Sequence, residues 1–286
     1  MPELPEVEVL VRHLAPLLQG RTIRRVEVRR ARVLRPTSEQ EFVRVLTGAK
    51  FTALSRRGKY LLFQLRLPRR KTTINLLGHL GMTGRMYLRP AGEAPPKHAA
   101  VIFRFDAENF IYEDTRYFGR LTLDPSALAR LGPEPFSAEF SPESFIAALR
   151  RSSQPVKIKL LDQSLVAGVG NIYASEALFR AGISPLRGAR SLEREEVGRL
   201  RDRIREVLAD AIRFGSSVPL DWSGEGKGDA LFYYGAVEAG SAPRSAEERF
   251  AVYGRDGEPC LRCSTEVVRC VQAARSTFHC PRCQPA

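Results

Sequence analysis

The sequence lacks any long hydrophobic run. No stretch approaches the roughly 20 apolar residues that a membrane-spanning helix needs. The chain also starts with an acidic, proline-containing segment, which has neither the basic nor the apolar part of a secretory signal. We therefore expect a cytoplasmic protein with no membrane partner.

Acidic residues are too few to balance the basic ones. The 286 residues include 45 Lys and Arg against 32 Asp and Glu, which gives a formal net charge of +13. Such a charge favours a polyanionic partner, although a basic surface without a specific partner is the alternative. No segment combines a wide apolar face with a basic one, as helices that bind membrane surfaces do. At this length the chain can form two domains with separate cores.

Cysteine is scarce, and four of the five cysteines form two Cys-x-x-Cys pairs. Cys260 and Cys263 are separated from Cys280 and Cys283 by sixteen residues. This spacing is typical of a closed tetrahedral zinc site, which would stabilise a segment too small to form its own core. Two disulfides are the alternative, which the absence of a secretory signal disfavours. Cys270 lies between the pairs and is not expected to bind the metal.

The chain begins with the sequence MPELPE. If Met1 is removed, the nitrogen of Pro2 becomes a secondary amine, which can attack an aldehyde-like carbon and form an iminium ion. An α-amino group has an unperturbed pKa of about 7.7–8.0, so more of it is neutral at pH 7 than of a lysine. Glu3 lies beside it as an acid or base. A frayed terminus is the alternative.

The first half of the chain is predicted to be one helix followed by short strands. An apolar stripe over residues 4–18 indicates an amphipathic helix. Strands are expected at residues 22–28, 50–55, 60–67, 72–77, 99–105, 109–113 and 119–123, and Ser38 and Glu41 would cap one short helix. Seven or so strands joined by turns predict a β-sandwich.

After a break at residues 132–136, the pattern becomes helical. Ser141 and Pro142 mark a helix start, and further helices are predicted at residues 157–165, 172–181 and 191–214. Gly168 and Gly170 permit a tight turn, after which Asn171 would be the N-cap of a helix whose amides could face a phosphate. An ordinary capped pair of helices is the alternative. Residues 215–250 are rich in Gly, Ser and Ala and predict a long loop.

Several short motifs occur in order along nearly the whole chain. They are PELPEVE at residues 2–8, RGKYLL at 57–62, GHLGMTG at 78–84, DTRYFG at 114–119, LGPEP at 131–135, the segment 168–176, YGRDGEPC at 253–260 and the cysteine cluster. Together they resemble the formamidopyrimidine-DNA glycosylase family, which comprises the Fpg/MutM and endonuclease VIII enzymes of base-excision repair.

The resemblance implies an α+β fold. An N-terminal catalytic β-sandwich with a leading helix would cover residues 1–132, a helix–two-turn–helix domain residues 133–250, and a four-cysteine zinc finger residues 251–286. The implied partner is damaged double-stranded DNA, from which the damaged nucleotide is flipped out. The implied cofactor is one structural Zn²⁺. A monomer associated with the bacterial nucleoid in the cytoplasm is expected.

The implied activity is that of a DNA glycosylase that is also an abasic-site lyase. Pro2 would attack C1′ of an oxidised purine nucleotide and form a Schiff base, and Glu3 would transfer protons at the deoxyribose. Lys59 is assigned a role in β-elimination, although RGK is also a good turn sequence that could present a solvated lysine. Arg275 is assigned a role in δ-elimination, and its alternative is a surface arginine.

The resemblance also implies a set of DNA contacts. The positions that match DNA-contacting residues are His79, His98, Arg116, Lys157 and Asn171. Met82, Arg116 and Phe118 match the three side chains that fill the space left by a flipped base. Without the resemblance, Met82 and Phe118 would be taken for core residues.

The chain departs from the family pattern at several positions. The family often has Asp-Pro-Arg-Arg-Phe-Gly where this chain has DTRYFG, and Lys-His-Asp-His where it has Lys97-His98-Ala99-Ala100. The segment 215–250, which would cap the flipped base, also differs. Lesion preference is therefore open: an endonuclease VIII-like enzyme for oxidised pyrimidines is one alternative, although Leu4 disfavours it. A zinc-dependent DNA-binding protein without catalysis is the other.

Overall fold

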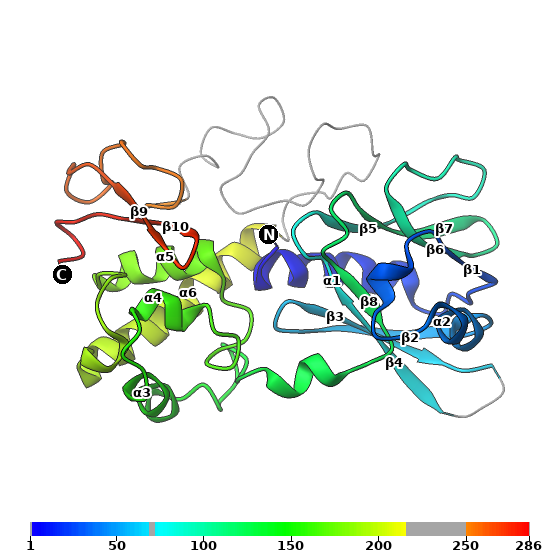
Figure 1. Ribbon diagram of the computed structural model, residues 1–286, viewed down its shortest axis with the longest axis horizontal. Helices are drawn as coiled ribbons and strands as arrows, with labels where there is room; N and C mark the ends of the chain where they lie inside the picture. Colours follow the sequence, from blue (N-terminus) through cyan, green and yellow to red (C-terminus); the bar gives the residue numbers. More distant parts are fainter. Residues whose placement is uncertain (1, 69–71, 216–249, 286) are drawn as a thin grey trace. The chain divides into compact units, whose positions relative to one another are not determined.

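The computed structural model describes residues 2–68, 72–215 and 250–285 (Figure 1). They form two compact units. The described part of the first unit comprises Pro2, residues 6–68 and residues 72–129; that of the second comprises Glu3–Pro5 with residues 130–215 and 250–285. The expected loop over 215–250 lies outside the described residues, apart from its two ends.

The first unit contains two four-stranded antiparallel sheets. One has the order β1 (Arg25–Val28), β6 (Ala99–Arg104), β7 (Glu108–Asp114) and β5 (Gly84–Pro90); the other has β2 (Lys50–Arg57), β3 (Tyr60–Arg66), β4 (Thr73–His79) and β8 (Arg120–Thr122). On β3 the buried Leu61, Phe63 and Leu65 alternate with more exposed side chains, so one face of the strand is buried. β5 was not predicted, because Gly84 and Pro90 at its ends are typical of turns.

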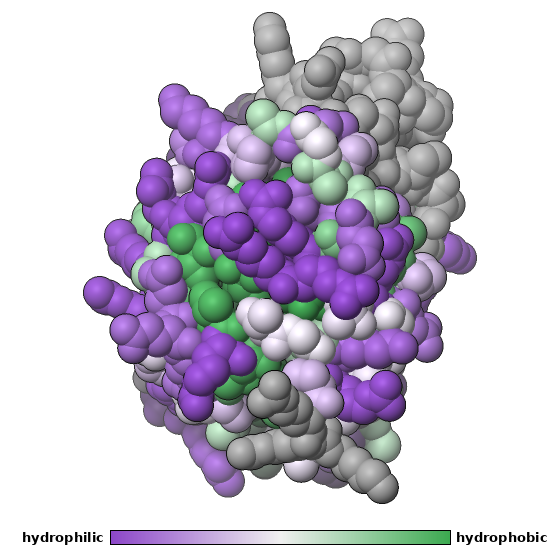
Figure 2. Space-filling view, turned by 90° about the vertical axis from the view of Figure 1, so that its right-hand side faces the viewer, coloured by the Kyte–Doolittle hydropathy of each residue, from purple (hydrophilic) through white to green (hydrophobic). Residues whose placement is uncertain are grey.

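The aromatic side chains of both sheets meet in the core of the first unit. Phe51 on β2 lies 6.0 Å from Phe63 on β3 and 6.3 Å from Phe103 on β6, measured between ring centroids. Phe110 on β7 lies 5.8 Å from Phe63. Two sheets packed through such side chains form a sandwich, so the predicted fold class is confirmed. On the side shown in Figure 2, hydrophilic side chains cover most of the surface and apolar ones are seen between them.

Helices flank the strands of the first unit. α1 (Leu4–Leu18) has the predicted bounds, and its buried residues Val7, Leu10 and Leu14 follow the expected stripe. Ser38 is the N-cap of α2 (Glu39–Leu46), and its hydroxyl accepts a hydrogen bond from Glu41 N as predicted. The described residues of this unit also form two short 3-10 helices, η1 (Ala31–Leu34) and η2 (Ser126–Arg130).

The second unit is helical and ends in a hairpin. Its elements are α3 (Pro142–Arg150), α4 (Val156–Leu160), α5 (Asn171–Ala181), η3 (Ala189–Ser191), α6 (Arg194–Gly215), β9 (Val268–Gln272) and β10 (Arg275–His279). Ser141 is the N-cap of α3, as predicted. α4 ends earlier than predicted, because Asp162 accepts hydrogen bonds from Ser164 and forms a turn. η3 ends at Ser191, where the sequence predicted the start of the last helix, and α6 itself begins at Arg194.

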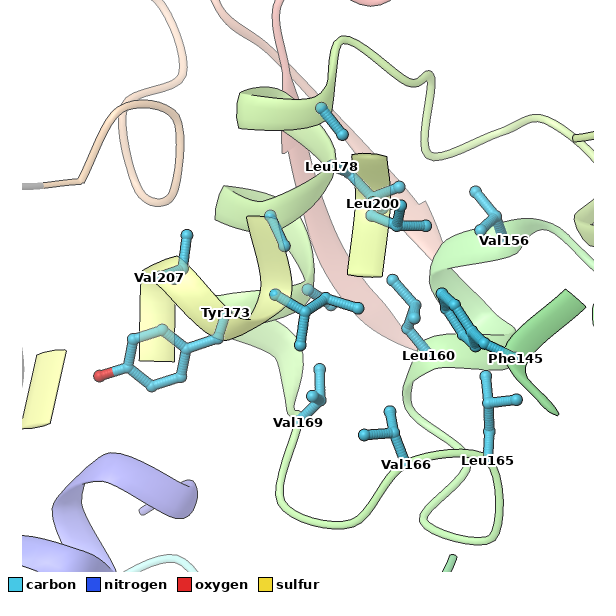
Figure 3. Packing of buried hydrophobic residues seen from close by; sticks show 14 of the residues in the cluster. Phe145, Val156, Leu160, Leu165, Val166, Val169, Tyr173, Leu178, Leu200 and Val207 are labelled. Carbon is cyan, nitrogen blue, oxygen red and sulfur yellow. The ribbon is translucent and has the colours of Figure 1, made fainter. Parts of the chain in front are cut away.

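One apolar cluster joins the helices of the second unit. In Figure 3, Phe145 of α3, Leu160 of α4, Leu178 of α5 and Leu200 of α6 point into a common core. Tyr173 is buried in the same cluster, so helix α5 is packed over nearly its whole circumference. Among the described helices, none is long and apolar enough to cross a membrane.

Candidate active site

The start of the chain is held by the segment that leads into α5. Glu3 is only 2% exposed, and its carboxylate accepts hydrogen bonds from Ile172 N at 2.9 Å and Tyr173 N at 3.4 Å. Leu4 N donates to Gly168 O at 3.1 Å. The first amides of α5 have no partner within the helix, and the helix dipole favours a negative charge there. The interpretation of residues 3–4 as a frayed end is therefore wrong, and Pro2 is buried as well.

Two glycines make room for this arrangement. A Cβ atom at Gly170 would lie 2.3 Å from Cδ of Glu3, and one at Gly168 would lie 2.5 Å from Cδ1 of Leu4. Gly168 also has a φ of +94°, which side chains rarely adopt. The prediction that Asn171 is the N-cap is wrong: Gly170 is the N-cap, and Asn171 is the first helical residue. The amides that were expected to face a phosphate are bonded to Glu3, because its carboxylate reaches them from the other end of the sequence.

Lys157 and Asn171 meet at one carbonyl group of the hairpin. Lys157 Nζ donates to Ser276 O at 2.9 Å and to Thr277 Oγ1 at 2.8 Å, and Asn171 Nδ2 donates to the same Ser276 O at 3.0 Å. Lys157 is fully buried, and this burial lowers its pKa to about 8 despite the nearby carboxylate of Glu3. Asn171 Oδ1 is buried and has no hydrogen-bond partner among the described residues.

The hairpin places Arg275 at the start of β10. Ala273 and Ala274 form the two-residue turn of the hairpin, with φ values of +46° and +59°. Positive φ at both positions is typical of the hairpin turns whose twist matches that of the two strands. Arg275 follows directly and is exposed. Its charge lowers the pKa of Lys157, so these two cations lie close enough to interact. The second unit thus brings Glu3, Lys157, Asn171 and the Arg275 hairpin together.

Glu176 is a buried acid to which the sequence analysis assigned no role. It is 2% exposed, and its carboxylate accepts hydrogen bonds from the backbone amides of Ala251, Val252 and Tyr253 at 2.9–3.0 Å. Burial raises the pKa of this carboxyl group although the amides oppose the shift. A glutamate within a helix that is otherwise buried was the available signal, because a buried carboxylate must find donors.

Lys59 follows a tight turn in the first unit. Gly58 has a φ of +56°, and Arg56 stabilises the turn by donating to Gly58 O at 3.0 Å and to Glu8 at 2.8 Å. Lys59 is only 6% exposed, so it is not the solvated turn lysine of the alternative interpretation.

His79 lies close to Lys59 and is neutral at pH 7. Burial lowers the pKa of His79 to about 4, and the positive charges of Lys59 and Arg120 add to this effect. Its Nδ1 accepts a hydrogen bond from Gly81 N at 3.0 Å. The proton of the neutral ring is therefore on Nε2, which can donate one uncharged hydrogen bond.

Met82 and Phe118 lie on two interlocked loops and are exposed. Their exposed fractions are 40% and 47%, so they are not the core residues that the pattern alone suggested. The guanidinium of Arg116 lies over the ring of Phe118, 4.7 Å from its centroid. A Cβ atom at Gly81 would lie 2.6 Å from Gly119 N, so the two loops touch through their backbones.

Asp114 holds these loops together. Its buried carboxylate accepts hydrogen bonds from Thr83 Oγ1 at 2.6 Å, Arg116 N at 3.1 Å and Gly119 N at 2.9 Å. It therefore joins the loop that carries Met82 to the loop that carries Arg116 and Phe118. Asp114 belongs to the DTRYFG motif, but its role in joining the loops was not predicted from the sequence.

The four paired cysteines converge in the second unit. The Sγ atoms of Cys260, Cys263, Cys280 and Cys283 all lie within 4.8 Å of one another. Two of the separations are 3.9 Å and 3.5 Å, and a zinc tetrahedron with Zn–S bonds of about 2.3 Å has edges of about 3.8 Å.

The thiols of this cluster need a cation to ionise together. A hydrogen bond with Thr265 lowers the pKa of Cys263 to about 6, whereas burial and the neighbouring sulfur atoms raise the pKa of Cys283 to about 12. A divalent metal compensates the charge of several thiolates. The predicted zinc site thus fits the four cysteines, and all five cysteines are free of disulfides.

Comparison with known families gives three matches. Residues 1–121 match the model of the formamidopyrimidine-DNA glycosylase N-terminal domain, residues 131–220 that of the formamidopyrimidine-DNA glycosylase H2TH domain, and residues 257–286 that of the zinc finger found in FPG and IleRS. The chain is similar to formamidopyrimidine-DNA glycosylases of Thermus thermophilus (43% identity, 99% of this chain and 98% of the relative) and Carboxydothermus hydrogenoformans (39%, 99% and 100%).

Solved structures of the Lactococcus lactis Fpg protein are also similar. They include a non-covalent complex with DNA containing an AP site (TM-score 0.83, 32% identity, 99% of this chain and all of that one). A complex with FAPY-dG-containing DNA has a TM-score of 0.84 at the same identity and coverage. A complex with DNA containing an oxidised pyrimidine has a TM-score of 0.85 at 32% identity, and both chains are fully covered.

Proposed function

The chain belongs to the formamidopyrimidine-DNA glycosylase family, and we propose that it is a bifunctional glycosylase and abasic-site lyase of damaged double-stranded DNA. Its substrates would be oxidised purines, namely formamidopyrimidines and 8-oxoguanine. The observation that supports this proposal most is the fixed start of the chain. An enzyme whose nucleophile is its terminal nitrogen needs that end to be ordered, and here Glu3 and Leu4 are bonded to residues 168–173.

The proposed reaction begins at Pro2. After removal of Met1, its neutral nitrogen attacks C1′ of the damaged nucleotide, and the base leaves with the electrons of the glycosidic bond. The nitrogen then loses its proton, and the bond between C1′ and O4′ breaks as O4′ takes up a proton, which opens the sugar ring and leaves an iminium ion. This ion makes the C2′ proton acidic, so loss of that proton expels the 3′ phosphate, and a second elimination expels the 5′ phosphate. Glu3 would transfer protons at the deoxyribose. Lys59 would assist the first elimination and Arg275 the second.

DNA would be held by neutral and charged donors together. In the first unit, Arg116 and His98 would contact the DNA backbone. His79 would donate a hydrogen bond to it from its uncharged Nε2–H. Lys157 and Asn171 are proposed to act through the carbonyl that they share, because Lys157 is itself fully buried. The exposed Met82, Arg116 and Phe118 would fill the space left by the flipped base. Phosphate contacts of this kind supply affinity rather than sequence preference.

The chain would act as a monomer in the cytoplasm, associated with the nucleoid. Its sandwich would be the catalytic domain over residues 1–132, its helical domain would cover 133–250 and its zinc finger 251–286. Four cysteines that fit one zinc ion support the last of these.

Oxidised pyrimidines are the second candidate class of substrate. The observation that favours them is the similarity to the Lactococcus lactis Fpg protein, whose solved complexes include DNA with an oxidised pyrimidine. A protein that only binds DNA is disfavoured, because the buried carboxylate of Glu3 costs desolvation energy that binding alone does not require.

A lesion panel combined with borohydride trapping tests the proposal. Duplexes would carry 8-oxoguanine, a formamidopyrimidine, thymine glycol, dihydrouracil or an abasic site, each opposite every base. We expect a covalent adduct with the abasic site and faster single-turnover excision of the purine lesions. Faster excision of thymine glycol would assign the pyrimidine class instead, and binding without any trapped adduct would refute catalysis through an amine.

A further inference from the structure

The end of strand β1 fixes Arg30 beside the start of β6. The backbone amides of Arg29 and Arg30 both donate to Ala100 O, at 2.9 Å and 3.1 Å. These bonds place Arg30 close to His98, which precedes Ala100 by two residues and is half-buried. The position of the Arg30 backbone is therefore set by the sheet rather than by a free loop.

The side chain of Arg30 is exposed and has no acidic partner among the described residues. It donates one hydrogen bond to the neighbouring carbonyl of Arg29. Two neighbouring arginines are neutralised: Arg24 binds both carboxylate oxygens of Asp106, and Arg29 pairs with Glu27. Arg30 thus keeps its full charge for an external anion.

The ring of Tyr117 supports this charge. Arg30 Cζ lies 5.3 Å from the centroid of the Tyr117 ring. The centroid of the His98 ring lies 6.4 Å from the same Tyr117 centroid. A guanidinium that stacks on an aromatic ring still presents the N–H groups of its edge, and these match two oxygens of a phosphate. The three side chains form one cluster with two possible phosphate donors.

Tyr117 has an unusual backbone for this role. Its φ is +54°, a region that residues with a bulky side chain rarely adopt. Asp114 holds that backbone by accepting hydrogen bonds from the amides of Arg116 and Gly119, on either side of Tyr117. The loop thereby turns the ring of Tyr117 toward Arg30 while its neighbours Arg116 and Phe118 remain exposed.

We propose that Arg30, Tyr117 and His98 form a binding site for one phosphate of the DNA backbone, in which Arg30 supplies the charge and Tyr117 positions it. The site would hold the DNA strand beside the exposed Arg116 and Phe118, because one loop carries these two residues and Tyr117 between them. The anion is a phosphate of duplex DNA rather than a free one, since charge complementarity over a long backbone is what a net charge of +13 favours. This inference rests on the proposed function only for the identity of the partner.

The test is the salt dependence of binding to a duplex that contains a tetrahydrofuran abasic-site analogue. Arg30→Ala should make the slope of log K against log salt shallower by up to about one unit, since each neutralised phosphate contributes about 0.9. Tyr117→Leu should cause part of the same loss, and Tyr117→Phe, which retains the ring, should restore the slope. Arg30→Ala combined with Tyr117→Leu should be no worse than Arg30→Ala alone, because both act on one contact.

Arg24→Ala is the matched control, since it removes an exposed arginine whose charge Asp106 already neutralises. It should leave the slope of the wild type. Equal slopes for Arg30→Ala and the wild type, or equal losses for Arg30→Ala and Arg24→Ala, would overturn the phosphate site. Borohydride trapping by the wild type reports separately on the proposed function, so a failure of the site and a failure of the function give different results.

Discussion

The second unit buries several charged side chains of the candidate site region in hydrogen bonds, whereas the first unit exposes two large apolar ones. Glu3, Lys157 and Glu176 are at most 2% exposed and bond to backbone groups of the same unit. Met82 and Phe118 are 40% and 47% exposed on loops of the first unit. Burying a polar group costs free energy unless its hydrogen bonds are made. The hydrogen bonds of the second unit therefore fix the positions of these side chains before any ligand arrives. Exposed apolar side chains contribute favourable free energy only when a partner covers them and removes them from water.

The largest effect expected in this comparison comes from the end of the chain. Retaining Met1, or any tag on Pro2, converts the nitrogen of Pro2 into an amide and should abolish Schiff-base formation. Borohydride trapping on an abasic-site duplex measures it, and the same protein after removal of the tag is the control. Duplex binding should persist, because the contacts proposed for phosphates do not involve Pro2. A blocked protein that still traps would remove Pro2 from the mechanism.

Gly170→Ala tests whether geometry fixed by burial is essential in the second unit. The new Cβ atom would meet the carboxylate of Glu3 at 2.3 Å, so Glu3 or the helix end must move. A misplacement of about 1 Å can cost about 10²-fold in rate, and we expect a loss of base excision of that order. Gly198→Ala in α6 is the control, because nothing lies within 4 Å of the position that its Cβ would take. Equal excision rates for the two variants would show that the position of Glu3 is not critical.

Metal removal tests the hairpin of the same unit. Cys280→Ser should release one equivalent of zinc and loosen the segment that carries Arg275 and Ser276, with a loss of duplex affinity of roughly 10-fold or more. Cys270→Ser should keep both the metal and the affinity, since Cys270 is not part of the cluster. Metal analysis and binding measurements on the two variants check this. Freshly purified active protein without zinc would contradict it.

Asp114→Ala tests whether the exposed loops of the first unit depend on the hydrogen bonds that join them. Removal of the carboxylate leaves the amides of Arg116 and Gly119 without their partner, which costs about 1–3 kcal/mol for each buried group. We expect a lower melting temperature and weaker discrimination of the opposite base, with little change in cleavage of an abasic site. Asp124→Ala, which removes bonds to Ser126 in one turn, should do less. Equal discrimination in both variants would mean that the loops do not need Asp114.

The smallest effect concerns His79. Its pKa of about 4 in the folded protein lies below the value of an unfolded histidine, so the unfolded chain binds the extra proton more readily. This contribution to stability is therefore present above about pH 6.5 and is lost as the pH falls toward 4. His79→Gln should remove that part of the acid dependence of the melting temperature. A titration of His79 by NMR with a midpoint near 6.5 would contradict the neutral donor proposed here.

Much of the local structure follows from the sequence. The stripe of Val7, Leu10 and Leu14 fixed helix α1, and Ser38 and Ser141 marked the starts of α2 and α3. The spacing of the cysteines was sufficient for the metal site. These features depend on residues close together in the chain, and their period or spacing records the contact directly.

The tertiary structure decided where the polar groups of the candidate site are bonded. The carboxylate of Glu3 and the amide of Ile172 are 169 positions apart, and no local pattern indicates that they meet. For the same reason the sequence predicted Asn171 as an N-cap, although Gly170 takes that place. Other contacts also join distant segments. They are the hydrogen bonds of the buried Lys157, the three hydrogen bonds that Glu176 accepts and the contact between Arg30 and the Tyr117 ring. Chemistry-bearing residues can be found from their order along the chain, but their partners are set by which segments pack together.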